Sequence, residues 1–194
     1  MLSIVLPSSL HGNKHIQGAM EIIDDLSERA KDILKFRGTI LNDIPNEFIY
    51  VAFIGRDASS RLHPDIVTRL MEVTGYSDYE ALEFLGDSVY ELVMSEELLR
   101  HSKTADQAAI LGNSARSNKL MASMMRSVHL CDDLVDEKKC ADRFEAIIGA
   151  LYLFLESRGL DSIQVIGSWL NSIWKLNQIY RDTFNVRRIH DYLV

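Results

Sequence analysis

Four acidic residues recur at intervals of three, four and four along one segment of the chain: Glu80, Glu83, Asp87 and Glu91. On an α-helix, which advances about 100° per residue, this spacing places all four carboxylates in one narrow arc. Like charges at these spacings repel one another by roughly 0.2–0.5 kcal/mol per pair, and no lysine or arginine lies between positions 73 and 99 to relieve them. A bound cation would relieve them. A solvated acidic face on an amphipathic helix is the alternative interpretation.

A second acidic pair, Asp142 and Glu145, precedes a segment that is apolar through Leu155. A helix that is apolar all round is a central, buried helix. The pair also matches a capping box, in which Asp142 would be the N-cap and Glu145 the third helical residue. This spacing alone leaves both interpretations open.

Both acidic segments contain a glycine, Gly86 in the first and Gly149 in the second. Glycine inside a helix costs roughly 1 kcal/mol relative to alanine. We therefore expect another part of the chain to approach the backbone closely at both positions. The simplest arrangement packs the acidic face of the first helix against the start of the second.

In that arrangement four carboxylates would converge: Glu83, Asp87, Asp142 and Glu145. Buried carboxylates without partners either protonate or recruit cations. Oxygen ligands without histidine or cysteine suit hard ions such as Mg²⁺ or Mn²⁺. Carboxylate sites with two metal ions support phosphodiester hydrolysis, so the residues predict an acidic metal site for phosphoryl chemistry.

The two segments resemble the motifs of the ribonuclease III family. Residues 80–88 have the sequence EALEFLGDS, which resembles the family signature ERLEFLGDS with Ala81 in place of arginine. Residues 142–150 have the sequence DRFEAIIGA, which resembles the second motif, D-x-x-E-A-x-x-G-A. The resemblance covers about residues 62–180, and residues 118–120 resemble a connecting motif.

The resemblance implies an all-α ribonuclease III endonuclease domain that forms a homodimer. It also implies Mg²⁺-dependent cleavage of double-stranded RNA, with Mn²⁺ as a substitute, leaving 5′-phosphate and 3′-hydroxyl ends with short 3′ overhangs. By motif position the metal ligands would be Glu83, Asp87, Asp142 and Glu145. Glu80 would be a supporting acidic residue. Lys138 matches a basic residue of some eukaryotic members, and a solvated lysine is the alternative.

Phe84 falls near the acidic arc rather than with the apolar residues Leu82, Leu85 and Val89 on the helical projection. Burying a large aromatic side chain is worth roughly 1.5–3 kcal/mol. The resemblance implies that an aromatic residue at this position fills a socket in a partner subunit. Packing against the chain's own N-terminal extension is the alternative.

The formal net charge of −7 argues against nucleic-acid binding, but the charge is unevenly distributed. Residues 100–126 carry five basic residues and one acid, Asp106. We expect RNA contacts from this window, where a solvated basic face is the alternative: Arg100, Lys103, Arg116, Asn118 and Lys119. We expect no double-stranded RNA-binding domain after the second motif, and therefore weak, salt-dependent binding.

Helical periodicity recurs along most of the chain and predicts an all-α protein. The expected helices cover residues 16–36, 62–73, 78–100, 113–129, 141–157 and 160–179, with a short one near 186–193. Residues 47–54 suit a strand or a short helix. We expect residues 1–60 to form an N-terminal extension and residues 61–194 the ribonuclease III catalytic domain.

The two cysteines, Cys131 and Cys140, predict neither a disulfide framework nor a metal site, which favours a reducing compartment. No apolar run has the length of a membrane span, and residues 1–7 lack the features of a signal peptide. We therefore expect an intracellular protein, in the cytoplasm with the nucleus or the mitochondrion as alternatives, and without a membrane partner or a small-molecule cofactor. A structural ribonuclease III-like subunit of an RNA-containing assembly and an unrelated metal-dependent phosphatase are the alternatives. Structural subunits often lack the carboxylates that are all present here, which favours the enzyme.

Overall fold

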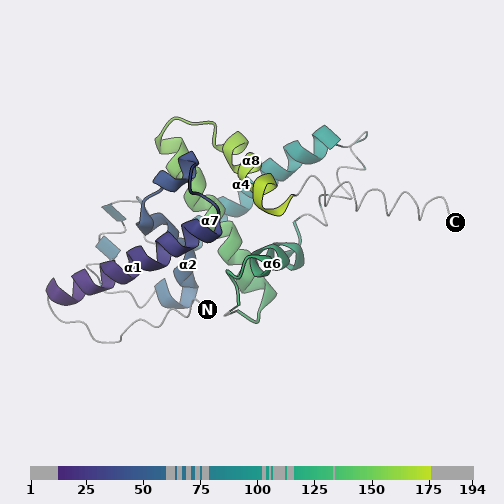
Figure 1. Ribbon diagram of the computed structural model, residues 1–194. Coiled ribbons are helices and arrows are strands. Elements are labelled where there is room, and N and C mark those ends of the chain that lie inside the picture. Colours follow the sequence, from purple (N-terminus) through teal and green to yellow (C-terminus); the bar gives the residue numbers. More distant parts are fainter. Residues whose placement is uncertain are drawn as a thin grey trace.

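The computed structural model describes residues 13–59, 79–101, 116–132 and 134–175, together with residues 64, 67, 68, 71, 72, 75, 104, 106 and 112. Every regular element in this part of the chain is helical, which confirms the predicted all-α class. The elements are α1 (Asn13–Ile33), the 3-10 helix η1 (Ile40–Asp43), α2 (Asn46–Ser59), α4 (Tyr79–His101), α6 (Asn118–Ser127), α7 (Glu137–Ser157) and α8 (Ser162–Trp174) (Figure 1).

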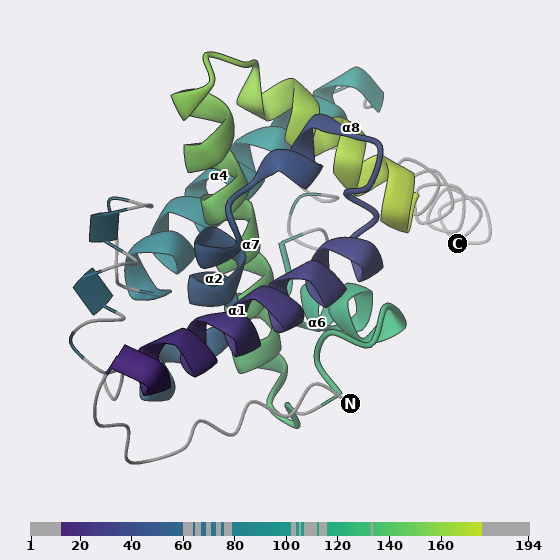
Figure 2. The ribbon, with the colours of Figure 1, turned by 60° about the vertical axis from the view of Figure 1, so that its left-hand side comes forward.

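Helix α7 is the centre of the fold, as its apolar sequence predicts. Every residue from Arg143 to Leu151 is buried. The helix contacts α2, α4, α6 and α8, and Figures 1 and 2 show it passing between them. It begins at Glu137, four residues before the expected start, because Asp136 is its N-cap and accepts a hydrogen bond from the Lys138 amide at 2.8 Å.

Residues 13–59 form α1 and α2. Helix α2 packs against α7, and α1 lies alongside α2 (Figure 2). The expected strand or short helix at residues 47–54 is part of α2, a helix interrupted at Gly55, where φ is 72°. Ser27 Oγ donates a hydrogen bond to the Asn46 carbonyl oxygen at 2.9 Å, and Trp169 Nε1 donates to the Leu34 carbonyl oxygen at 2.9 Å. The division of the chain at residue 60 stays a prediction.

Five aromatic rings connect α4, α7 and α8 to the loop after α1. Phe36, Trp169, Trp174, Phe144 and Tyr90 form a chain of edge-to-face contacts with centroids 5.2–5.6 Å apart. Such pairs add about 0.5–1.5 kcal/mol each beyond the area that they bury. Trp174 Nε1 also donates to the Met124 carbonyl oxygen at 2.9 Å, which ties α8 to α6. The chain of rings therefore fixes α4 relative to α7.

Cys131 and Cys140 form a disulfide with a Cα–Cα distance of 5.8 Å. The expectation that these cysteines are unpaired is wrong, because the loop after α6 brings Cys131 back beside the first turn of α7. The expectation of a reducing compartment depended on free cysteines and loses that support.

Several expected helices differ in extent from those observed. Residues 113–129 contain the shorter helix α6, and α8 ends at Trp174, where Lys175 adopts a left-handed conformation with φ of 50°. The helix expected at 62–73 lies mostly outside the described residues, and the one near 186–193 lies wholly outside them. None of the described helices is long and apolar enough to cross a membrane.

Candidate metal centre

Helices α4 and α7 cross in direct backbone contact at Gly86 and Gly149. A Cβ atom on Gly149 would lie 2.1 Å from the Leu82 carbonyl oxygen, a distance that no side chain tolerates. The expected close approach at both glycines is therefore confirmed. It brings Glu83, one helical turn before Gly86, to the first turns of α7.

Three carboxylates from the two helices converge there. One carboxylate oxygen from each of Glu83, Asp142 and Glu145 lies within 4.8 Å of the other two. Glu145 is buried, with 9% of its surface exposed, and the other two residues are half-buried. We call these three residues the acidic cluster. It contains three of the four carboxylates expected to converge.

The acidic cluster changes the protonation of its buried member. Burial first, and then the negative charges of Asp87, Asp142 and Glu83, raise the pKa of Glu145 to about 8, while Lys138 lowers it. Without a cation, this carboxyl group therefore keeps its proton at neutral pH. A bound cation would reverse the balance by stabilising the carboxylate.

Asp87, the fourth expected ligand, is exposed at the edge of the acidic cluster and is not one of its three members. It contributes the largest single charge effect on the pKa of Glu145. Burial and the negative charge of Glu91 raise the pKa of Asp87, and Arg116 lowers it. Asp87 therefore adds negative potential at the site.

Lys138 lies beside the acidic cluster, in contact with Asp142. Its Nζ donates hydrogen bonds to Asp142 Oδ1 at 2.8 Å and to Asp142 Oδ2 at 3.0 Å. The hydrogen bond to Asp142 raises the pKa of Lys138, so the amine stays charged. The side chain is also exposed, so the role of Lys138 at the site stays a prediction beside the alternative of a solvated lysine.

The capping-box interpretation of Asp142 and Glu145 is wrong. Because α7 begins at Glu137 with Asp136 as its N-cap, Asp142 and Glu145 lie in the second and third turns of the helix. Two acidic residues there, one of them buried, need another explanation.

The donor set fits a hard divalent cation. The acidic cluster offers carboxylate oxygens, and no histidine or cysteine of the described residues joins it. Cys140, two residues before Asp142, is bonded to Cys131 and provides no thiolate. Carboxylate oxygens without nitrogen or sulfur ligands are typical of Mg²⁺ and Mn²⁺ sites.

Tyr79 and Arg143 were not among the expected site residues, although Tyr79 lies against the acidic cluster and Arg143 directly follows Asp142 in the sequence. Tyr79 is the buried first residue of α4, and burial together with the charges of Glu83, Asp142 and Glu145 raises its pKa. A sequence signal for Tyr79 exists, since it lies one helical turn before Glu83.

Arg143 is buried beside Asp142. Its Nη1 donates to the Leu130 carbonyl oxygen at 2.8 Å, and its guanidinium lies 5.5 Å from the centroid of the Phe53 ring. No local pattern in the sequence indicates the burial of this charge.

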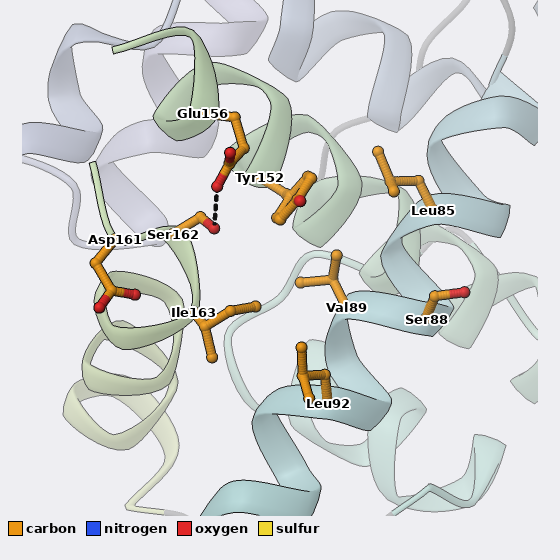
Figure 3. Close-up of a pocket in the computed structure, with 9 residues that line it drawn as sticks. All are labelled: Leu85, Ser88, Val89, Leu92, Tyr152, Glu156, Asp161, Ser162 and Ile163. Atoms are coloured by element: carbon orange, nitrogen blue, oxygen red, sulfur yellow. Dashed lines mark hydrogen bonds between the residues drawn. The ribbon is translucent and has the colours of Figure 1, made fainter. Parts of the chain in front are cut away.

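Phe84 is 79% exposed, so it does not pack against the described part of its own chain. Glu80, one turn before it, is also exposed. A pocket of about 390 Å³ lies between α4, α7 and the start of α8, and Leu85, the residue after Phe84, is among those that line it (Figure 3). Its lining residues are Leu85, Ser88, Val89, Leu92, Tyr152, Glu156, Asp161, Ser162 and Ile163.

Apolar side chains face each other across this pocket. Figure 3 shows Leu85, Val89 and Leu92 of α4 opposite Tyr152 and Ile163. Leu92 is 50% exposed, although it belongs to the face of α4 that the periodicity predicts to be apolar. The periodicity of α4 does not predict the pocket, which forms because α8 covers only part of that face.

Two of the expected RNA-binding arginines bind acidic residues of α4. Arg100 pairs with Glu96 at 3.2 Å and with Glu97 at 2.8 Å. Arg116 pairs with Glu91 at 3.2 Å. Arg100 lies on α4 itself, close in sequence to its partners, whereas Arg116 relieves repulsion on α4 from a distant part of the chain.

The remaining expected RNA contacts are less constrained. Asn118 and Lys119 are exposed at the start of α6, whose N-cap is Ser117. Lys103 lies outside the described residues.

Comparisons with known proteins give partial matches to three ribonucleases. The chain is 33% identical over 113 residues to Ribonuclease 3 2 of Nostoc sp., covering 51% of this chain and 44% of that protein. It is 31% identical over 137 residues to Ribonuclease 3 of Chlorobium luteolum, covering 60% and 49%. It is 31% identical over 88 residues to Ribonuclease 3 of Chlorobaculum tepidum, covering 38% and 32%.

The chain therefore spans less than half the length of each of these relatives. No family model matches it, and no solved structure matches it significantly.

Proposed function

Because the chain is related to the ribonuclease III family, we propose that it is an endonuclease that cleaves double-stranded RNA with Mg²⁺ or Mn²⁺. The observation that carries the proposal is the acidic cluster of Glu83, Asp142 and Glu145, in which the pKa of the buried Glu145 is raised to about 8. A carboxylate set of this kind is costly to keep ionised unless it holds a cation. The proposed products carry 5′-phosphate and 3′-hydroxyl ends with short 3′ overhangs.

The three members of the acidic cluster would hold the cation, with Asp87 adding negative charge beside them. When bound, a divalent ion supplies water activation and charge stabilisation for phosphodiester hydrolysis. Lys138 carries a positive charge at the mouth of the site, where it would attract an incoming phosphate. Gly86 and Gly149 hold the two helices at the separation that this arrangement requires.

We also propose that two copies associate through α4, with Phe84 of each copy in the pocket of the other. Phe84 is 79% exposed, and it lies next to Leu85 and one helical turn from Ser88, which both line the pocket. In a two-fold symmetric dimer, each copy would contribute one Phe84 and one pocket to the interface. The two acidic clusters would then act on the two strands of one duplex.

RNA binding by this chain is proposed to be weak and dependent on salt. The net charge is −7, and Arg100 and Arg116 already bind acids of α4. Lys119 and Asn118 are exposed at the start of α6 and are available for phosphate contacts. Contacts of this kind weaken as salt concentration rises.

The test is incubation of the purified protein with long double-stranded RNA and Mg²⁺, followed by analysis of the product ends. We expect short duplexes with 5′-phosphates, no products in EDTA, and no products from Glu145→Gln. The matched control is Glu137→Gln, which removes an exposed charge from the first turn of the same helix and should cleave normally. Cleavage at the full rate in EDTA would contradict the metal mechanism. Absence of both cleavage and Mn²⁺ binding would favour a structural subunit.

A further inference from the structure

We propose that the Cys131–Cys140 disulfide positions Asp142 relative to Glu83 and Glu145, so that the affinity of the acidic cluster for a divalent cation depends on the redox state of this cysteine pair. The inference rests on the proposed metal site. The inference concerns the first two turns of α7, which carry the proposed metal ligand Asp142 and the basic residue Lys138.

The disulfide connects the loop after α6 to the first turn of α7. Cys140 lies midway between Lys138 and Asp142, and Cys131 lies in the loop. Both cysteines are buried. The bond therefore closes a short ring that contains Asp136, the N-cap of the helix.

Two arginines hold the same loop against the two helices. Arg143, directly after Asp142, donates from Nη1 to the Leu130 carbonyl oxygen at 2.8 Å. Arg126, in the last turn of α6, donates from Nη2 to the carbonyl oxygens of Leu134 and Val135 at 3.4 and 3.2 Å. The loop and the start of α7 thus form one unit, and the disulfide is its covalent bond.

The other two members of the acidic cluster do not depend on this unit. Glu83 belongs to α4, and Glu145 lies where α7 crosses α4 at Gly86 and Gly149. Asp142 and Lys138 lie nearer the helix start, where the first backbone amides lack partners within the helix and the ends fray most readily. Loss of the disulfide should therefore shift Asp142 relative to the other two ligands while the helix crossing stays intact.

Reduction by a small dithiol breaks the bond between the two sulfur atoms. Each sulfur becomes a thiol, and the dithiol is oxidised to its cyclic disulfide, so that electrons and protons balance. Because both cysteines are buried, the loop must open before the dithiol can attack. The redox state is therefore slow to change once the chain has folded.

The experiment measures Mn²⁺ affinity on the full chain by calorimetry, in the oxidised form and after a long dithiol treatment with the dithiol then removed under argon. We expect roughly tenfold weaker Mn²⁺ binding after reduction, as is typical when the support of a metal ligand is lost. Amide hydrogen exchange should become faster at residues 137–142 and stay unchanged at residues 146–151. If reduction instead destabilised the whole fold, amide exchange would become faster in both segments.

Two variants complete the test. The double variant Cys131→Ser/Cys140→Ser should bind Mn²⁺ like the reduced protein and should not respond to the dithiol. Ser27→Ala removes a hydrogen bond between α1 and α2 far from the loop, so it should lower the melting temperature without changing Mn²⁺ affinity.

The possible failures are distinguishable. Equal Mn²⁺ affinity of the oxidised and reduced forms would overturn this inference and leave the proposed function intact. No Mn²⁺ binding by the oxidised wild type would instead contradict the proposed function.

Discussion

Gly86 of α4 and Gly149 of α7 lie in contact through their backbones. A Cβ atom on Gly86 would lie 2.8 Å from the Gly149 nitrogen and 1.7 Å from the Glu145 carbonyl oxygen. A Cβ atom on Gly149 would lie 3.2 Å from the Gly86 nitrogen. Because Glu83 and Glu145 are attached to these two backbones within one helical turn of the contact, the glycine pair sets the width of the acidic cluster.

Gly86→Ala should therefore destabilise the protein and weaken Mn²⁺ binding together. The added methyl group must push α4 and α7 apart, and overpacking of this kind costs about 1–3 kcal/mol or more. The gain of about 1 kcal/mol in helix propensity does not offset that cost. Urea unfolding and Mn²⁺ calorimetry on the same preparation measure both effects.

Gly167→Ala on α8 is the matched control for this substitution. The nearest atom to its added Cβ would be Val93 Cγ1 at 3.4 Å, which is an ordinary contact. We expect its stability to be unchanged or slightly raised and its Mn²⁺ affinity to equal that of the wild type. If Gly86→Ala had the stability and Mn²⁺ affinity of Gly167→Ala, the contact between α4 and α7 would not determine the geometry of the metal site.

The glycine contact was predictable from sequence because glycine inside a helix has a cost that a close neighbour explains. The start of α7 was not, since Asp142 and Glu145 have the spacing of a capping box whether or not a helix begins there. Only the N-cap at Asp136, five residues after Cys131, shows that they lie inside the helix.

Other features of the site depend on tertiary structure that spacing does not determine. The disulfide forms because the loop after α6 returns to α7, and the distance between two cysteines in sequence does not report such a return. Asp87 shares the acidic arc of Glu83, yet it lies outside the acidic cluster, a difference that the spacing alone does not show. Likewise, Arg116 reaches Glu91 from 25 positions away.

The stability of the metal-free protein should fall as pH rises from about 5 to 8. The folded state keeps the Glu145 proton up to a pKa of about 8, whereas the unfolded chain releases it near the ordinary value of 4.5. The folded state therefore binds more protons in this window, and the free energy of unfolding decreases with pH by at most about 1.4 kcal/mol per unit from this group. Urea unfolding in EDTA at pH 5.5, 6.5 and 7.5 measures the slope.

Glu145→Gln supplies the control for this pH dependence, because the amide does not titrate. Its free energy of unfolding should depend less on pH than that of the wild type, and it should exceed the wild-type value at pH 7.5. Mg²⁺ should stabilise the wild type at pH 7.5 and release protons into the buffer. Parallel pH profiles for the two proteins in EDTA would exclude Glu145 as the group that holds the proton.

Lys138→Met should strengthen Mn²⁺ binding several-fold while slowing RNA cleavage. The ammonium group occupies both oxygens of Asp142 at 2.8 and 3.0 Å, so its removal frees a ligand and takes a positive charge from the site. The same charge would attract the RNA phosphate, and its loss should raise the RNA concentration needed for half-maximal rate. Lys139→Met, one position along, is the control. Weaker Mn²⁺ binding by Lys138→Met than by Lys139→Met would show that the lysine supports the cluster rather than competing with the ion.

Phe84→Ala should convert a dimer into monomers at micromolar concentration while leaving each chain helical. Every dimer would bury two copies of this side chain, which is 79% exposed in the single chain, and burial of each is worth about 1.5–3 kcal/mol. Loss of both should weaken association roughly a hundredfold or more. Sedimentation velocity measures the change, with circular dichroism to monitor the fold. Val135→Ala, at a 97% exposed position outside α4, is the control and should sediment like the wild type. A wild-type chain that sediments as a monomer at these concentrations would rule out association through Phe84, as would a Phe84→Ala chain that stays dimeric.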